Sequence, residues 1–503
     1  MTQSYLWSLE FDRRGGETLR PDCNVFVLSL RRPFAPNQSL LSAMKAAWRP
    51  SGLYRSKQAP RSASSPFVCS KCRRTLSATS RAQRSPQLPK RPQSTWTQAV
   101  STAQSILNGH VNQDKRLAGI AVDPLRVVGK EMKFLTNNIR HLLGSGHPIL
   151  DTIAKYYTAS EGKHIRPLLV LLMSGATSHS PKAPRPIPPT SNVNIDDPIS
   201  PSSVLADINP SAAQAQPLSA SLVNSNHDLE NGDPNILPSQ RRLAEITELI
   251  HTASLLHDDV LDSSHSRRGA PSANMRFGNK MAVLAGDFLL GRASLALARL
   301  RDAEVIELLA TVIANLVEGE FMQLKNTALD EKQPVFSEET LSYYLQKTYL
   351  KSASLISKSC RAAALLGHCA PEVVDAAYAY GRNLGLAFQL VDDMLDYTTT
   401  RSEAVSFGKP AGADLELGLA TAPLLFAWKQ EPRLGLLVGR KFTGEGDVQM
   451  ARELVARSEG VEQTRALAQS YADKAVDAMR HFPGSEAKEG LLKMCVQTMQ
   501  RRK

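Results

Sequence analysis

The chain has 503 residues, enough for more than one domain, and its hydrophobic content of 42% can build a sizeable core. Its formal net charge is +12, but residues 1–113 hold 17 Lys and Arg against four acidic residues, a net of +13. Subtracting 13 from 12 leaves about −1 for residues 114–503, so the body is close to neutral. This distribution excludes nucleic acid as a partner of the body. No stretch reaches the roughly 18 apolar residues that a membrane span needs.

The leader has a targeting composition. From Cys23 to Gln113 there is no Asp or Glu, but there are 14 Lys and Arg among many Ser, Ala, Pro and Gln residues. Arg-rich, Ser-rich and acid-poor segments are typical of mitochondrial transit peptides. We therefore expect residues 1–95 to be a transit peptide and disordered leader, with a generic disordered basic tail as the alternative. All four leader acids precede Cys23, and we hypothesise that translation starts at Met44.

The body, residues 115–503, is predicted to be one all-α domain. Apolar residues recur at helical spacing from Lys130 to Leu143, and an apolar run spans Pro167 to Met173. Helical patterns follow one another from Leu243 onward, and strand-like alternation is absent. By itself this pattern predicts an all-α helical bundle.

A proline-rich segment interrupts this domain. Residues 178–240 hold 11 of the chain's 30 prolines, with much Ser, Asn and Ala. Such a composition cannot bury enough apolar surface to offset the entropy of ordering. We therefore predict a disordered insertion at residues 177–240, between two helices of one domain. Its acidic pair, Asp196 and Asp197, is assigned no function.

Two motifs of the form Asp-Asp-x-x-Asp stand in apolar surroundings. They comprise Asp258, Asp259 and Asp262, and Asp392, Asp393 and Asp396. Residues four apart share a helix face, where like charges repel. Carboxylate oxygens suit Mg²⁺, which also accepts phosphate oxygens and water. Two motifs together predict several Mg²⁺ ions around one diphosphate, whose departure they assist by neutralising charge. A solvated acidic helix end is the alternative for either motif alone.

Basic residues near these motifs are suited to binding diphosphate. Lys163 and Arg166 lie three apart, and Arg267 and Arg268 follow the first motif. Each pair alone is interpreted as solvated surface charge, but beside the aspartates phosphate binding is favoured. His251 lies seven residues before the first motif, two helical turns along the same face. A lone helical histidine is more often a satisfied core or surface residue.

These motifs resemble those of the trans-isoprenyl diphosphate synthases, over roughly Asp123 to Lys503 apart from the insertion. The resemblance implies an all-α fold, the isoprenoid-synthase-type helical bundle, with a deep central active-site cavity and the two aspartate motifs on opposite walls. It implies repeated condensation of isopentenyl diphosphate onto an allylic diphosphate, with Mg²⁺ as cofactor. The segment from Gly408 to Pro423 is similar to the mitochondrial polyprenyl synthases that make the ubiquinone side chain. We therefore expect a location in the mitochondrial matrix, with peripheral association with the inner membrane left open.

The resemblance also implies residue roles. The implied metal ligands are Asp258, Asp262, Asp392 and Asp396. Isopentenyl diphosphate binding is implied for Lys163, Arg166, His251 and Arg268. A place near the allylic diphosphate is implied for Arg267, Lys351, Gln389 and Lys409, with Ser352 standing where the family usually has threonine. Two positions depart from the family pattern, because Glu161 replaces a glycine and Gly418-Leu419 replaces Gly-Lys, which weakens the case for a second lysine there.

Product length has a steric interpretation. In this family the residues one turn before the first motif form part of the tunnel floor, and aromatics there close it in short-chain members. Ala253 and Ser254 occupy this place. Small residues leave the floor open, so we predict a product longer than about 15 carbons; the alternative is that they only permit helix packing.

Three other interpretations share some of these features. A terpene cyclase would use aspartates and Mg²⁺ but would not need the site at Lys163 and Arg166. A geranylgeranyl diphosphate synthase is the nearer alternative, and the leader and Gly418-Leu419 count against it. A non-catalytic subunit of a heteromeric synthase is disfavoured because all six motif aspartates are present. We expect a homodimer or a heteromer with a second synthase subunit.

Overall fold

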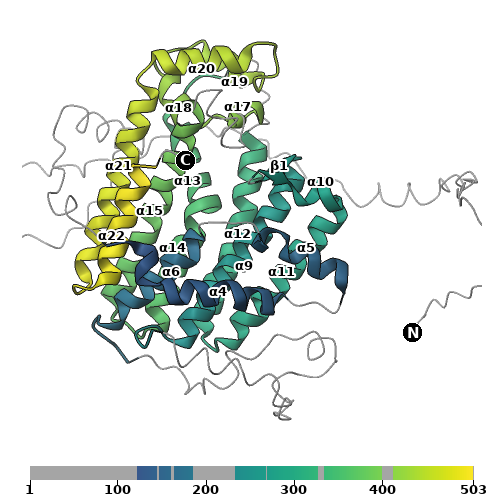
Figure 1. The fold of residues 1–503 in the computed structure, drawn as a ribbon. Helices are drawn as coiled ribbons and strands as arrows, with labels where there is room; N and C mark the ends of the chain where they lie inside the picture. Colours follow the sequence, from purple (N-terminus) through teal and green to yellow (C-terminus); the bar gives the residue numbers. More distant parts are fainter. Residues whose placement is uncertain are drawn as a thin grey trace, which may run out of the picture. The chain divides into compact units, whose positions relative to one another are not determined.

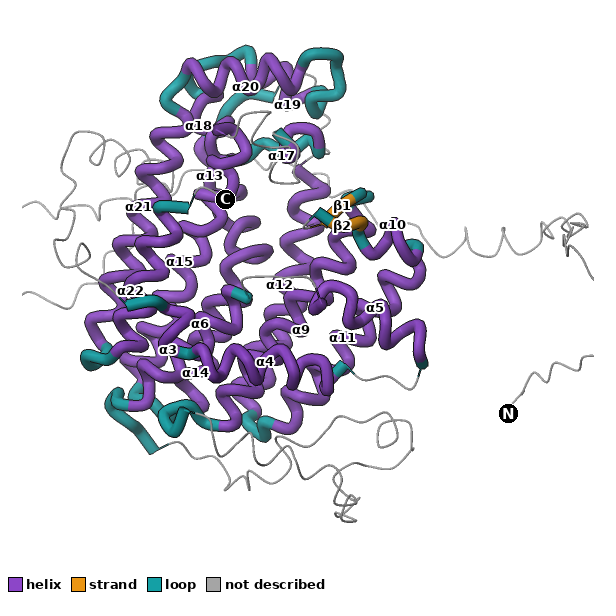
Figure 2. The backbone as a smooth tube through the Cα atoms, in the orientation of Figure 1, coloured by secondary structure: helices purple, strands orange, loops and turns teal. Residues whose placement is uncertain are grey.

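The computed structural model describes residues 122–143, 147–159, 164–184, 233–267, 269–326, 334–398 and 412–501, all within one compact unit, Pro89–Lys503. The described part is almost entirely helical, which confirms the predicted all-α class (Figure 2). Its elements are α3 (Pro124–Val127), α4 (Gly129–Leu142), α5 (Pro148–Ala159), α6 (Ile165–Ser178), α9 (Pro238–Leu261), β1 (Ser266–Arg267), β2 (Ala270–Pro271), α10 (Ala273–Phe277), α11 (Asn279–Arg299), α12 (Ala303–Asn326), α13 (Glu338–Thr348), the π-helix η2 (Tyr349–Ala353), α14 (Ser354–Leu366), α15 (Pro371–Thr398), α17 (Ala413–Glu416), α18 (Ala422–Trp428), α19 (Leu434–Gly439), α20 (Asp447–Arg457), α21 (Gly460–Ala478), the 3₁₀-helix η3 (Met479–His481) and α22 (Glu486–Met499).

The helices bury their apolar faces in two core clusters. In Figure 1, α9 lies along α11, and α15 lies beside α21; both pairs pack closely, as does α14 against α15. The larger cluster joins α4 to α6, α9, α11, α12 and α14, while the smaller one joins α13 to α18, α20 and α21. Helix α15 belongs to both, since Leu384 lies in the larger cluster and Leu390 in the smaller. The second aspartate motif therefore follows directly after the point where α15 passes between the clusters.

The two motif-bearing helices begin at the same end of the bundle. At the start of α9, the Gln240 amide donates to the Ala363 carbonyl (2.9 Å) near the end of α14. Just before α15, Cys369 forms an isolated β-bridge with Lys182, which follows α6. The ammonium group of Lys182 donates to the Thr177 carbonyl (2.7 Å) at the end of α6 and to the Gly367 carbonyl at the end of α14. These contacts bring the starts of α9 and α15 together.

Because α9 and α15 start at the same end, their aspartate motifs lie at similar distances along the bundle. Asp258 lies 20 residues after Pro238, and Asp392 lies 21 residues after Pro371. At about 1.5 Å per residue, both motifs lie roughly 30 Å along their helices from the shared starting end. The fold thus carries two acidic motifs to the opposite end of the bundle.

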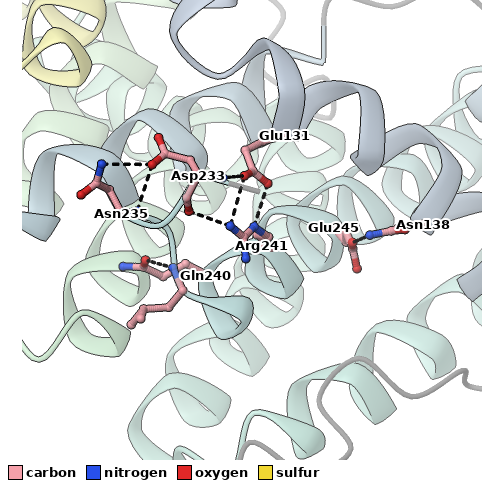
Figure 3. A network of polar contacts seen from close by, with 8 residues as sticks. Glu131, Asn138, Asp233, Asn235, Gln240, Arg241 and Glu245 are labelled. Atoms are coloured by element: carbon pink, nitrogen blue, oxygen red, sulfur yellow. Dashed lines mark hydrogen bonds and ion pairs between the residues drawn. The ribbon is translucent and has the colours of Figure 1, made fainter. Parts of the chain in front are cut away.

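The return from the predicted insertion is fixed by a polar network (Figure 3). The Asp233 amide donates to Glu131 on α4 (2.7 Å), and the Arg241 guanidinium bonds both Glu131 (2.8 Å) and the Asp233 carbonyl (2.7 Å). Because α6 continues to Ser178 and α9 begins at Pro238, the outer edges of the predicted segment lie in helices. Residues 185–232 and the predicted leader, residues 1–95, lie outside the described residues, so both stay predictions.

Two details differ from the expectations. Residues Ser266–Arg267 and Ala270–Pro271 form a short antiparallel pair, although no strand was predicted. Helix α11 is long and apolar enough to cross a membrane by length and composition, which corrects the expectation that no stretch would be. It nevertheless packs against α9 and α5, and 44% of its apolar window is buried inside the protein.

Candidate active site

The first aspartate motif lies where α9 ends. Helix α9 stops at Leu261, and Asp262 is its C-cap, so the third aspartate stands just beyond the helix. Burial raises the pKa of the Asp258 carboxyl to about 6 and also raises that of Asp262. The charge of Lys351 opposes both shifts, whereas that of Glu320 adds to them. The first motif is therefore close to one cation and one further carboxylate from other helices.

Lys351 connects this motif to α12. Its ammonium group pairs with the Glu320 carboxylate and donates to the Gln323 side-chain oxygen (3.1 Å). A Cβ atom on Gly319 would lie 2.6 Å from Lys351 Cγ, so only glycine lets the lysine cross α12 here. Glu320 and Gln323 were not predicted as site residues. Their signal in the sequence is a polar pair three residues apart within an apolar helix.

The central aspartate of the first motif is buried and bonded. Asp259 is 0% exposed, and the Arg267 guanidinium forms two bonds to it, of 2.8 and 2.6 Å. The Tyr157 hydroxyl of α5 also donates to Asp259 and accepts from the Ala273 amide (2.8 Å). Arg267, expected near the allylic diphosphate, thus holds Asp259 in this structure.

The outer aspartates of the second motif contact other parts of the chain. Asp392 pairs with Arg501 (3.1 Å), which follows α22 and also lies over the Phe388 ring. Asp396 accepts from the backbone amides of Gly412 (3.2 Å) and Ala413 at the start of α17. Burial raises the pKa of Asp396 and these amide bonds lower it, with a net increase.

A chain of hydrogen bonds joins the second motif to the π-helix. The Ser352 hydroxyl donates to Gln389 (2.7 Å), and the Gln389 amide donates to Asp393 (2.8 Å). The Tyr344 hydroxyl of α13 donates to the other oxygen of Asp393 (2.5 Å). Burial raises the pKa of Asp393 to about 6. Ser352 and Gln389 were both predicted, and the structure brings them together.

The π-helix explains how two adjacent residues serve the two motifs. Residues Tyr349–Ala353 form one wide turn between α13 and α14, a feature that occurs often at functional sites. From this turn Lys351 reaches Glu320, beside the first motif, while Ser352 bonds Gln389, beside the second. The turn is therefore the element that lies between the two aspartate motifs.

The third group of predicted residues meets where α6 begins. The Arg166 guanidinium lies 2.8 Å from His251 Nε2, and His164 lies 2.8 Å from the carboxylate of Glu248, also on α9. His164 has a left-handed backbone (φ 39°) as the N-cap of α6, so Glu248 holds the strained residue that precedes the helix carrying Arg166. Glu248 was not predicted; a buried acid in an apolar helix is its signal in the sequence. Three further predicted residues, Lys163, Arg268 and Lys409, lie outside the described residues.

A small pocket lies between α6, α14, α15 and α22, beside Arg166. Apolar side chains from all four helices line it, among them Leu169, Ile356, Phe388 and Met494. Arg166 thus contacts His251 and also lines this mostly apolar pocket.

The predicted tunnel-floor residues lie on α9, one turn before the first motif. Ala253 is 0% exposed, whereas Ser254 is half-buried and its hydroxyl donates to the His251 carbonyl (2.9 Å). Both side chains are small, and their role in product length stays a prediction.

The donors of the first motif fit a divalent cation. Asp258 and Asp262 are partly buried carboxylates whose pKa values are raised, and the charge of Glu320 adds to this. A hard cation would relieve that negative charge. Among the described residues, no group of three or more His, Cys, Asp or Glu side chains could hold a metal alone. Mg²⁺ commonly takes only one or two carboxylates, with phosphate oxygens and water completing its shell, so the residues present fit it.

Comparison with known proteins agrees with this arrangement. The profile of the family described as "Polyprenyl synthetase" matches residues 211–455, which include both aspartate motifs. The chain is similar to a probable mitochondrial hexaprenyl pyrophosphate synthase of Neurospora crassa, with 67% identity covering 82% of this chain and 90% of the relative. It is also similar to decaprenyl-diphosphate synthase subunit 1 of Schizosaccharomyces pombe, with 46% identity covering 75% and 91% of the two chains.

Solved structures share the fold. One is a polyprenyl synthase from Caulobacter crescentus, complexed with calcium and isoprenyl diphosphate. It has a TM-score of 0.58 and 28% sequence identity, and the match covers 76% of this chain and 97% of that one.

Proposed function

The chain belongs to the polyprenyl synthetase family of prenyltransferases, and we propose that it makes a long-chain all-trans polyprenyl diphosphate, the precursor of the ubiquinone side chain. It does so by adding isopentenyl diphosphate repeatedly to an allylic diphosphate. The observation that supports this most is the position of the two aspartate motifs at the same end of the bundle, with the turn that carries Lys351 and Ser352 between them. The relatives named as hexaprenyl and decaprenyl synthases support a long product.

We infer that the first step uses both aspartate motifs. Asp258 and Asp262 from one side, and Asp392 and Asp396 from the other, would hold Mg²⁺. When bound, Mg²⁺ supplies charge neutralisation for the diphosphate leaving group. Lys351 adds a positive charge beside Asp258. The C–O bond of the allylic substrate breaks, and its electron pair leaves with the diphosphate.

The second substrate is seated by the basic group at the start of α6. Arg166, oriented by His251, would bind the diphosphate of isopentenyl diphosphate through its forked donors. The double bond of this substrate attacks the allylic cation and forms the new C–C bond. Loss of one proton then restores a double bond, and the departing diphosphate accepts that proton. The apolar side chains of the bundle keep water from the cation.

The product would extend past Ala253 and Ser254. Both are small, so neither of them closes the space beyond the first motif as an aromatic ring would. Growth then continues past 15 carbons, as expected for a precursor of the ubiquinone side chain.

The location and assembly follow from the leader and the surface. The mitochondrial relatives and the acid-poor leader support a mitochondrial location; we propose the matrix, with an apolar product that favours peripheral contact with the inner membrane.

On α12, Val317, Phe321 and Leu324 are 53%, 68% and 52% exposed and share one face. Exposed apolar surface of this kind marks an interface, and we propose that a second copy of the chain covers it.

A direct assay tests this function. The full chain is incubated with Mg²⁺, labelled isopentenyl diphosphate and allylic primers, and the products are sized by chromatography. We expect products longer than 20 carbons. Products that stop at 20 carbons would instead support a geranylgeranyl diphosphate synthase, and no elongation even after addition of a second synthase subunit would refute a catalytic role.

Matched variants separate the motif from general charge. Asp258→Asn should lower the elongation rate by roughly 100-fold or more, because a single electrostatic stabiliser of a transition state is commonly worth that much. The double variant Asp196→Asn with Asp197→Asn removes acidic charge from the insertion and should keep the wild-type rate.

The proposed interface on α12 has its own test. Analytical ultracentrifugation of Phe321→Glu should give monomers if a second copy covers α12; dimers that persist would contradict the proposed interface.

A further inference from the structure

The central aspartates of the two motifs differ from their neighbours in the same way. Asp259 is 0% exposed and Asp393 is 4% exposed, whereas the outer aspartates Asp258, Asp262 and Asp392 are all more exposed. Successive residues of an α-helix point about 100° apart, so an aspartate beside a cavity-facing one must point elsewhere. A buried carboxylate is costly unless it is bonded, so each central aspartate needs partners of its own.

In the first motif that partner comes from α5. The Tyr157 hydroxyl donates to Asp259 Oδ2, and the same hydroxyl accepts the Ala273 amide hydrogen at 2.8 Å. Arg267 completes the set with two bonds to Asp259 and lies 5.9 Å above the Tyr157 ring. Tyr157 therefore links α5 and α10 to the end of α9 at one carboxylate.

In the second motif the partner comes from α13. The Tyr344 hydroxyl donates to Asp393 Oδ2 at 2.5 Å, and Tyr344 itself is only 2% exposed. The other oxygen, Asp393 Oδ1, accepts from Gln389, which in turn accepts from Ser352. The buried ammonium group of Lys347, one turn after Tyr344, lies 5.5 Å above the tyrosine ring and lends positive charge to Asp393.

The two arrangements share one chemistry but come from different places in the chain. Each has a buried central carboxylate, one tyrosine hydroxyl donor and one nearby cation, Arg267 or Lys347. The tyrosines stand on α5 and α13, far apart in sequence. We propose that Tyr157 and Tyr344 are positioning residues: each fixes the central aspartate, and thereby the rotation of the helix that presents the outer aspartates to the metal.

This inference rests on the proposed role of the outer aspartates as metal ligands. The tyrosines do not touch metal or substrate in it; they act through Asp259 and Asp393. Groups that orient metal ligands from behind typically change metal affinity or activity by 10- to 100-fold. If a tyrosine only filled space, a substitution that keeps the ring and removes the hydroxyl would leave the metal affinity unchanged.

The test uses Tyr157→Phe and Tyr344→Phe in the full chain. The matched control is Tyr380→Phe, because Tyr380 is also fully buried but its hydroxyl donates to the Leu491 carbonyl, away from both motifs. Mn²⁺ binding in the presence of inorganic diphosphate is followed by electron paramagnetic resonance, and the melting temperature is measured for each variant.

We expect each motif variant to bind Mn²⁺ about 10-fold more weakly, the lower end of the typical range, while Tyr380→Phe loses stability without losing Mn²⁺ affinity. The half-saturating Mg²⁺ concentration for elongation should rise by the same factor, with a smaller change in the rate at saturating Mg²⁺. Wild-type affinity in both motif variants would overturn the inference while leaving the proposed function intact. Absence of Mn²⁺ binding in the wild type would overturn both.

A second variant covers the case in which a tyrosine variant does not fold. Asp259→Asn keeps an oxygen that accepts the Tyr157 hydroxyl bond but removes the charge that Arg267 pairs with. If the hydroxyl bond sets the orientation, Asp259→Asn keeps Mn²⁺ affinity closer to wild type than Asp259→Leu does. Equal losses in these two variants would contradict the role of the tyrosine bond.

Discussion

Acidification should weaken metal binding through Asp258. Burial raises the pKa of this carboxyl to about 6 in the folded protein, with Glu320 adding to the increase and Lys351 opposing it. The metal binds only the ionised form, so protons compete with it. The apparent affinity falls by the factor 1 + 10^(pKa − pH), which is close to 1 at about pH 7.5 and about 11 at about pH 5.

Acidification has the opposite effect on the stability of the metal-free protein. Because the folded pKa of Asp258 lies above its unfolded value, its contribution to stability is present below the unfolded pKa and is lost as pH rises through about 6. The metal-free protein is therefore destabilised by this group at neutral pH, and a bound cation removes that cost. Added Mg²⁺ with diphosphate should accordingly raise the melting temperature more at about pH 7.5 than at about pH 5.

The assay is a Mn²⁺ titration, followed by electron paramagnetic resonance, over this pH range. Asp258→Asn is the matched control, because it removes the titrating carboxyl and keeps the side-chain size. Its affinity should be lower at neutral pH and should vary less with pH; the raised pKa of Asp262 leaves a residual dependence. Equal wild-type affinity at about pH 5 and about pH 7.5, or an unchanged slope in Asp258→Asn, would refute this reasoning.

Three further substitutions address other parts of the chain. Ala253→Phe should shorten the products, whereas Ala253→Ser should not; unchanged product lengths on chromatography would reject the floor assignment. Glu248→Gln removes the charge that faces His164 in its left-handed turn, and should raise KM for isopentenyl diphosphate several-fold with little change in KM for the primer; equal changes in both would contradict a local role. Lys182→Met removes two bonds to helix-end carbonyls and should lower the free energy of unfolding by about 1.5–3 kcal/mol, measured by urea denaturation, without changing either KM.

The sequence alone predicted much of the local structure and chemistry. Helical periodicity and the lack of alternating segments predicted an all-α bundle, because a helix shows its buried face every three to four residues whatever it packs against. The Asp-Asp-x-x-Asp spacing places its outer carboxylates on one helix face, so two candidate metal-binding sites could be predicted before any tertiary contact was known. Family membership followed from the same short segments.

Some features of the structure differ from what the sequence led us to expect. The pair β1–β2 is too short to show a period. Helix α11 is apolar enough for a membrane by composition, while 44% of its apolar window is buried in the bundle. Arg267 was expected beside a substrate, and the structure pairs it with Asp259. A charge pattern cannot distinguish these outcomes, since the same guanidinium can bind either a carboxylate or a phosphate.

Only the tertiary structure decided which groups stand behind and between the motifs. These groups come from segments widely separated in sequence. They are Tyr157 on α5, Glu320 on α12, Tyr344 on α13 and Arg501 at the end of α22. Their roles depend on how helices are rotated and stacked, which is set by side-chain packing across the two core clusters rather than by any local pattern. The sequence by itself thus determined which carboxylates the chain presents and at what spacing, and the packing of distant helices determined which groups contact them.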